Sequence, residues 1–311
     1  MLALDNIRRS WLLVPVLRPE RLLSATSAGA DVVILDLAEF VAEADKPAAR
    51  EAVKDNLEPA KAGGAEVFIQ IDPELMLADL RASVWPGLNG VVISRANTPD
   101  QVKQVDAIIS SLESERGLLP GSVELVASLE TASGNHNGFD IATASPRIWG
   151  VTLGRADLVM DLRPEPSGEI HLMPYLTQRL VTLAGAAGKV PLGAWWRFPD
   201  RGLLATPENT LQAARRGRAI GFKGSFCVLD EQVEPLNDGF TPSDQELLDA
   251  QRLGETYAEA TAAGTVAVVN GGYITIDIAR QAANTLAWAQ ACAERERFKA
   301  AAVEGRPVPL P

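Results

Sequence analysis

Short apolar runs alternate with longer amphipathic stretches along most of the chain. Eight runs of six or seven residues stand out, and most of them are rich in Val, Leu or Ile. Runs of this kind are typical of strands that are buried on both faces of a parallel sheet. A strand followed by a helix, eight times over, predicts an α/β fold, a (β/α)8 TIM barrel, across residues 1–240. The runs are Trp11–Val16, Asp31–Leu37, Glu66–Asp72, Gly90–Arg95, Glu124–Glu130, Ile148–Gly154, Pro191–Trp196 and Gly224–Leu229.

Helix-start signals lie between several of these runs. Thr98-Pro99-Asp100 and Thr206-Pro207-Glu208 each place an N-cap residue directly before a proline at the first helical position. The alternative to a barrel is a doubly wound open sheet. The even spacing of eight units and the lack of a GxGxxG motif after an early strand favour the barrel.

Residues 241–311 form a C-terminal extension that does not continue the barrel pattern. Ser243-Asp244-Gln245-Glu246 is a capping box, which predicts the start of a helix. We expect the extension to cover the barrel mouth or to form a subunit contact. Its expected elements are a helix to about Ala263, a hairpin within Gly264–Ile278 turned at Asn270-Gly271-Gly272, and a helix over roughly Ile276–Ala301.

Composition narrows the classes of partner. The 311 residues are 47% hydrophobic and carry 40 acids against 29 Lys and Arg, a net charge of −11. This charge argues against binding to nucleic acid or to an anionic membrane. The first apolar run is broken by Pro15 and is too short for a signal peptide or a membrane span. Cys227 and Cys292 show no metal or redox spacing, so we expect free thiols in a cytoplasmic protein.

Two acids stand where buried strands are expected to open into loops. Glu130 follows the run Glu124–Leu129, and Asp157 follows Ile148–Leu153 after a short turn. The carboxyl ends of barrel strands form the rim of the active site, so we expect both side chains there. The structural alternative is that Glu130 caps the following helix and Asp157 caps a short one. Other polar residues expected at this rim are Asp36, Glu39, Gln70, Asp72, Ser94, Arg95 and Asp161.

A cation would relieve the repulsion among so many acids. Carboxylate oxygens without nearby His or Cys favour Mg²⁺, with Mn²⁺ as the alternative, over zinc. The two histidines, His136 and His171, lie in expected surface loops, which argues against a His-based general base or zinc site. We therefore predict that Glu130 and Asp157 hold one Mg²⁺ ion.

Eight segments, in this order along the chain, form a specific set of motifs: RRSWLLVP, RPER, GADVVILDLAE, DKPAAR, SLETASG, TLGRADLVMDL, the region from GFKG, and FTPSDQE. With these motifs the chain is similar to the citrate lyase β-subunit-like branch of the HpcH/HpaI aldolases, which includes malyl-CoA and citramalyl-CoA lyases. The resemblance runs from about Arg8 to Arg280 and places the family's two Mg²⁺-binding carboxylates on Glu130 and Asp157.

The resemblance implies a Mg²⁺-dependent barrel, a homotrimer or higher homo-oligomer, in which a C-terminal segment helps to cover a neighbour's active site. It also implies cleavage or formation of a C–C bond between a 2-oxo acid and an enolisable acyl-CoA.

Several strand-end residues depart from the family pattern. An RIN-type strand end reads Gln70-Ile71-Asp72 here, which removes an arginine expected to bind a substrate oxygen. The metal pair is thus kept while much of the surrounding substrate shell differs. The other departures are Val16-Leu17 for GS, Asp36-Leu37-Ala38-Glu39 for DLED, Ser94-Arg95-Ala96-Asn97 for a PK-x-E strand end, Val228-Leu229-Asp230 for IHP, and Asn270–Thr275 for DGKMVD.

These observations define the expected function. We predict a Mg²⁺-dependent C–C lyase or aldolase that acts on a hydroxy acid derived from a 2-oxo acid, in one form as its CoA thioester. The alternatives are a catalytically silent, ligand-binding homologue and an aldolase for free 2-oxo acids. Beside the metal pair, the expected site residues are Asp36, Glu39, Gln70, Asp72 and Arg95 for catalysis or substrate binding, Arg18 and Arg155 for CoA or phosphate, and Tyr273, Thr275 and Asp277 for covering the neighbouring subunit.

Overall fold

The computed structural model describes residues 7–154, 172–197 and 202–305 of the chain. Two compact units are present, Arg8–Phe240 and the segment that starts at Thr241, and each is described by itself. The division falls between α10 (Val233–Phe240) and α11 (Asp244–Ala262).

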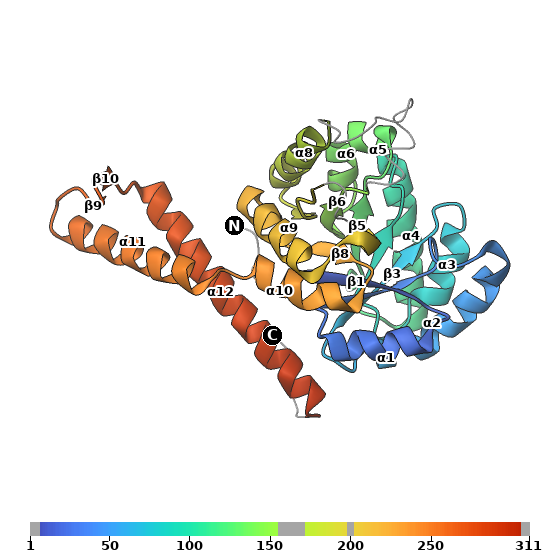
Figure 1. The fold of residues 1–311 in the computed structure, drawn as a ribbon. Coiled ribbons are helices and arrows are strands. Elements are labelled where there is room, and N and C mark those ends of the chain that lie inside the picture. The colour runs from blue at the N-terminus through green and yellow to red at the C-terminus, as the bar shows by residue number, and fades with distance from the viewer. Residues whose placement is uncertain (1–6, 155–171, 198–201, 306–311) are drawn as a thin grey trace. The chain divides into compact units, whose positions relative to one another are not determined.

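The first unit is built on eight parallel strands in the order β7-β6-β5-β4-β3-β2-β1-β8 (Figure 1). Two backbone hydrogen bonds join the ends of this order: the Gly193 N–H donates to Gly224 O at 2.7 Å, and the Lys223 N–H donates to Pro191 O at 3.1 Å. The predicted (β/α)8 fold is therefore confirmed. The strands are β1 (Ser10–Pro15), β2 (Val32–Asp36), β3 (Glu66–Ile71), β4 (Gly90–Ile93), β5 (Glu124–Ser128), β6 (Ile148–Thr152), β7 (Val190–Leu192) and β8 (Ser225–Cys227).

Each predicted run overlaps one strand, but β7 and β8 have only three residues each, and β7 ends well before its predicted run does. Gly193 has a φ of 157°, and the chain leaves the sheet there. The Trp195 N–H then donates to Ala213 O of the next helix at 3.0 Å, so the strand prediction was wrong for the last part of Pro191–Trp196.

Helices surround the sheet, and their starts match the expected capping signals. Thr98 and Thr206 each accept a hydrogen bond from a backbone N–H of the first turn, and a proline follows each cap. The helices are α1 (Pro19–Ala28), α2 (Lys46–Lys61), α3 (Met76–Ser83), α4 (Pro99–Arg116), α5 (Ala132–His136), α6 (Gly138–Thr143), α8 (Leu172–Ala187), α9 (Pro207–Ile220) and α10, with 3₁₀ turns at Glu43–Asp45, Gly202–Leu204 and Asp230–Gln232.

Alternation along the strands creates two apolar layers. One layer lies inside the barrel, where Trp11 contacts Phe68, Trp149 and Phe226 with ring centroids 4.8, 5.5 and 5.6 Å apart. The other layer lies between the strands and the helices and contains residues such as Leu12. At the amino ends of the strands the interior is closed by charges. Arg8, Glu66 and Glu124 form ion pairs there, and Arg9 binds Asp31 at 2.9 Å.

The second unit contains α11, the strands β9 (Val268–Val269) and β10 (Gly272–Tyr273), and α12 (Ile276–Val303). The capping box at Ser243 is confirmed, because Ser243 and Glu246 bond to each other's backbone N–H groups. The hairpin prediction is also confirmed. Asn270 and Gly271 connect the strands with φ values of 50° and 79°, as a two-residue type I′ turn requires. No helix within the described residues is long and apolar enough to cross a membrane.

Candidate active site

The inward-facing positions of the barrel change from apolar to polar over two residues at the carboxyl ends of the strands. Residues two positions apart on a strand face the same side. The residue two positions after such an apolar interior residue therefore also faces inward, but it lies nearer the mouth. The interior therefore ends in a polar layer directly below the rim where barrel enzymes place their active sites. The apolar residues are Ile34, Phe68, Val92 and Val126, and the residues of the polar layer are Asp36, Gln70, Ser94, Ser128 and Thr152.

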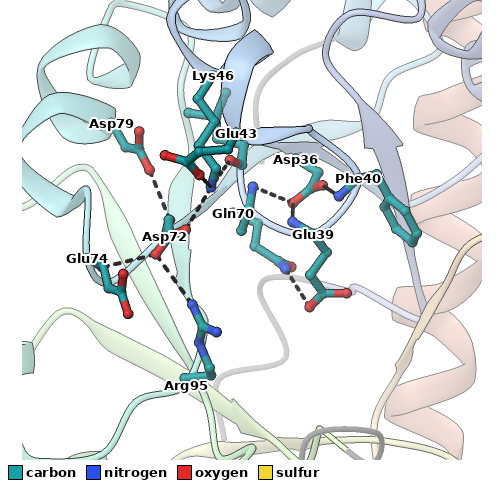
Figure 2. Close-up of polar contacts among 12 residues, drawn as sticks. Asp36, Glu39, Phe40, Glu43, Lys46, Gln70, Asp72, Glu74, Asp79 and Arg95 are labelled. Carbon is teal, nitrogen blue, oxygen red and sulfur yellow. Dashed lines mark hydrogen bonds and ion pairs between the residues drawn. The ribbon is translucent and has the colours of Figure 1, made fainter.

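Asp36 uses its carboxylate to organise the loop that follows β2. It accepts backbone hydrogen bonds from Ala38 at 2.9 Å, Glu39 at 3.2 Å and Phe40 at 2.6 Å (Figure 2). Burial raises the pKa of Asp36 above its ordinary value, although these three hydrogen bonds oppose the shift. The adjacent Gln70 donates its amide N–H to Glu39 at 3.0 Å. Asp36, Glu39 and Gln70 thus lie together, and their catalytic role stays a prediction.

Asp72 lies between two cations, as Figure 2 shows. Its Oδ2 is 2.7 Å from Lys46 Nζ, and its Oδ1 is 3.4 Å from Arg95 Nη2. Burial alone would raise the pKa of Asp72, but hydrogen bonds from Lys46 and Glu74 N–H and the charges of Lys46 and Arg95 hold this pKa below its ordinary value. Arg95 has a φ of 46°, an uncommon backbone conformation for a non-glycine residue. The structure therefore brings the predicted residues Asp72 and Arg95 into contact.

Lys46 is the residue of this cluster that sequence reasoning missed. It is the first residue of α2, and its ammonium group also donates to Leu37 O at 3.4 Å. The available signal was the DKPAAR segment, which places a lysine directly before Pro47 at a helix start. Lys46 thus supplies some of the positive charge that was expected from a metal ion among the rim acids.

Glu130 lies two residues beyond β5, and its side chain is buried with 5% exposure. A Cβ placed on Gly154 would lie 2.1 Å from Glu130 Cγ, so the Glu130 side chain occupies the space beside this glycine. Glu130 does not cap the following helix, because Thr131 is the N-cap of α5 and accepts from the Gly134 N–H at 2.9 Å. The alternative role of Glu130 as a helix cap was therefore wrong, whereas the alternative role of Asp157 falls outside the described residues. Asp157, Arg155 and Asp161 lie outside the described residues, so the metal pair stays a prediction.

Four further residues were predicted to bind CoA or to cover a neighbouring subunit. Arg18 is exposed at the start of α1 and lies 3.6 Å from Glu20. In the second unit, Tyr273 is 72% exposed, Thr275 caps α12, and Asp277 lies in its first turn. Their role in covering a neighbour stays a prediction.

Of the two histidines, His136 is exposed, as expected. It ends the short helix α5 rather than lying in a loop. His171 lies outside the described residues.

The chain is similar to several known proteins in sequence and in structure. The chain is 25% identical over 291 residues to the citrate lyase subunit beta of Leuconostoc mesenteroides subsp. cremoris, covering 92% of this chain and 95% of that protein. It is 31% identical over 298 residues to the (3S)-malyl-CoA thioesterase of Cereibacter sphaeroides, with the same coverage. The structure of CitE from Mycobacterium tuberculosis in complex with magnesium, acetoacetate and coenzyme A matches with a TM-score of 0.70 and 25% identity, covering 90% of this chain and 97% of that one. The model of the HpcH/HpaI aldolase/citrate lyase family, a CoA-ester lyase family, matches residues 9–229, and the chain belongs to this family.

Proposed function

We propose that the protein is a Mg²⁺-dependent lyase that cleaves or forms a carbon–carbon bond in the CoA thioester of a small hydroxy acid. The observation that carries this proposal is the position of Glu130, a buried carboxylate beyond β5 whose side chain packs against Gly154. The carboxyl ends of barrel strands form the rim of the active site, and a carboxylate at this rim can bind Mg²⁺. Family membership supports the same chemistry.

The residues present suit Mg²⁺. Among the described residues, no group of three or more His, Cys, Asp or Glu side chains could hold a metal ion. Mg²⁺ does not need such a cage, since it binds one or two carboxylates and keeps several waters or substrate oxygens. Asp157 follows Gly154 by three residues, a chain length that spans at most about 11 Å. Bound by Glu130 and Asp157, the ion would polarise the substrate carbonyl and stabilise the charge that develops as the C–C bond breaks.

Arg95 is our candidate for binding a substrate carboxylate. The cluster Lys46–Asp72–Arg95 carries two positive charges and one negative charge, and Arg95 is its most exposed member, at 42%. Gln70, which stands where the family pattern has an arginine, cannot supply this charge. The names of the relatives, citrate lyase and malyl-CoA thioesterase, support a carboxylic acid substrate carried on CoA.

A second candidate activity is hydrolysis of the thioester bond. The observation that favours it is the 31% identity to a malyl-CoA thioesterase over nearly the whole chain. A catalytically silent ligand-binding protein is the third candidate. It is favoured by the engagement of Asp36 with three backbone N–H groups and by Gln70 in place of arginine.

We also propose a cytoplasmic location and a homotrimeric or higher assembly, in which the hairpin region of one subunit covers the active site of the next. Tyr273, Thr275 and Asp277 are the residues proposed for that cover, since all three lie in or directly after the hairpin.

Equilibrium binding tests the proposed site. Calorimetry with oxaloacetate should show binding to the wild type that depends on Mg²⁺. Glu130→Gln and Asp157→Asn should each weaken this binding at least about tenfold, because each removes a charged metal ligand. Asp140→Asn changes an exposed acid on α6 and serves as the matched control. Unchanged binding in Glu130→Gln would contradict the proposed metal site.

A further inference from the structure

We infer that Lys46 and Asp72 are positioning residues for Arg95. Together they set where Arg95 lies and how much of its positive charge Asp72 neutralises. This inference rests on the proposed function in one respect, namely that Arg95 binds a substrate carboxylate. In this inference Lys46 acts on Arg95 through Asp72, the carboxylate that contacts both side chains. Neither the resemblance of the chain to its family nor the strand-end pattern assigns this role to a residue of α2.

The two contacts of Asp72 are unequal. Lys46 Nζ lies 2.7 Å from one carboxylate oxygen, whereas Arg95 Nη2 lies 3.4 Å from the other, at the outer edge of hydrogen-bonding distance. Lys46 is 7% exposed and Asp72 is 13% exposed, while Arg95 is 42% exposed. Asp72 is therefore bound mainly to the buried lysine and holds the exposed arginine only weakly.

This inequality determines how much positive charge the mouth receives. With Lys46 in place, the negative charge of Asp72 is balanced by the lysine, and Arg95 stays available to an anionic ligand. Without the lysine, Asp72 would pair with Arg95 alone and cancel its charge. A charge-assisted contact to a carboxylate is among the stronger hydrogen bonds of a protein, so this competition would be felt in substrate binding.

The position of Asp72 does not depend on Lys46 alone. Its backbone N–H donates to Asp79 Oδ2 at 2.9 Å, and Asp79 binds Arg50 Nε at 2.7 Å. Its Oδ1 also accepts from the Glu74 N–H at 3.0 Å, as Figure 2 shows. Asp72 should therefore remain near Arg95 when Lys46 is replaced, so the effect of the replacement is electrostatic.

The first experiment measures the Kd of oxaloacetate at saturating Mg²⁺. Lys46→Met should raise this Kd about tenfold, and Lys46→Arg, which keeps the charge, should stay within about threefold of the wild type. In an Asp72→Asn background, Lys46→Met should have less than about a twofold effect, because the residue through which it acts has lost its charge. Lys54→Met replaces an exposed lysine of the same helix, one that packs over Trp85, and is the matched control. Equal effects of Lys46→Met in both backgrounds would overturn the inference.

The second experiment needs neither metal nor substrate. Phenylglyoxal modifies accessible arginines, and peptide mass spectrometry reports the rate at Arg95 in each variant. Lys46→Met should slow the modification of Arg95, and Asp72→Asn should speed it. Melting temperatures identify any variant that fails to fold, and Asp72→Asn alone still decides the outcome in that case.

The two experiments separate the two proposals. If the wild type does not bind oxaloacetate but the modification rates are as expected, the proposed function is refuted and the positioning role of Lys46 and Asp72 stands. Unchanged modification rates would refute this positioning role, whatever the binding result.

Discussion

Replacing Gly154 with alanine probes the metal site through the packing of Glu130. The added Cβ would lie 2.1 Å from Glu130 Cγ and 3.0 Å from both its Cβ and its carboxyl carbon. Ordinary van der Waals contact begins at 3.4 Å, so Cγ must retreat by about 1.3 Å. A metal site tolerates errors of only about 0.2 Å in its ligand distances. The displacement is several times larger, and the buried Glu130 side chain has little room to compensate.

We therefore expect Gly154→Ala to weaken metal binding by about 10- to 100-fold and to lower the free energy of unfolding by about 1–3 kcal/mol. Mn²⁺ titration followed by electron paramagnetic resonance gives the affinity, and urea denaturation gives the stability. Gly185→Ala is the control, because no atom lies within 4 Å of its Cβ position in α8 and alanine favours a helix by about 0.5–1 kcal/mol. Wild-type affinity in Gly154→Ala would refute the assignment of Glu130 as a metal ligand.

Two further predictions concern the barrel itself. The Ser94 hydroxyl is buried without a hydrogen-bond partner among the described residues, so Ser94→Ala should stabilise the protein by about 1 kcal/mol in urea denaturation. Ser10→Ala loses two hydrogen bonds and should destabilise the protein by about 1–2 kcal/mol. The reverse order of the two stabilities would contradict this reasoning. Burial raises the pKa values of Asp106 and Glu113, but hydrogen bonds from Ser145 and Arg147 to Asp106, and from Arg147 to Glu113, hold both pKa values below their ordinary 3.8 and 4.5. The stability from the two Arg147 pairs is therefore present above those values and is lost as the pH falls through the lowered pKa values. Arg147→Met should cost about 3–5 kcal/mol at pH 7 and less at pH 3, and a cost that does not change with pH would contradict this assignment.

The strands could be predicted because burial on both faces leaves an uninterrupted apolar run in the sequence. β2 shows this clearly, since all five of its residues are buried. The ends of the strands were less predictable. In the run Pro191–Trp196 the strand ends at Leu192, because Gly193 turns the backbone and the Trp195 N–H bonds to α9 instead. The sequence nevertheless stays apolar to Trp196, so its pattern does not mark the end of the strand.

The site could be predicted in part, for a similar physical reason. Glu130, Asp72 and Arg95 lie within two residues of the ends of their strands, so the fold alone places them at the mouth. Lys46 was missed because a lysine at a helix start is ordinarily solvated, and its burial depends on Asp72, a partner 26 residues away. The use of Asp36 as a backbone acceptor depends on the conformation of the loop after β2, which no apolar pattern encodes.

The products formed from malyl-CoA, with and without Mg²⁺, distinguish cleavage of a C–C bond from hydrolysis of the thioester. Cleavage of the C2–C3 bond moves the hydroxyl proton away and leaves glyoxylate and the enolate of acetyl-CoA, which then takes up a proton. Glyoxylate is quantified as its phenylhydrazone, and the free thiol of CoA reports thioester hydrolysis in the same sample. We predict Mg²⁺-dependent glyoxylate and acetyl-CoA in equal amounts, with the rate lowered at least about 100-fold in Glu130→Gln. Free thiol without glyoxylate, or glyoxylate formation that Glu130→Gln leaves unchanged, would contradict the account.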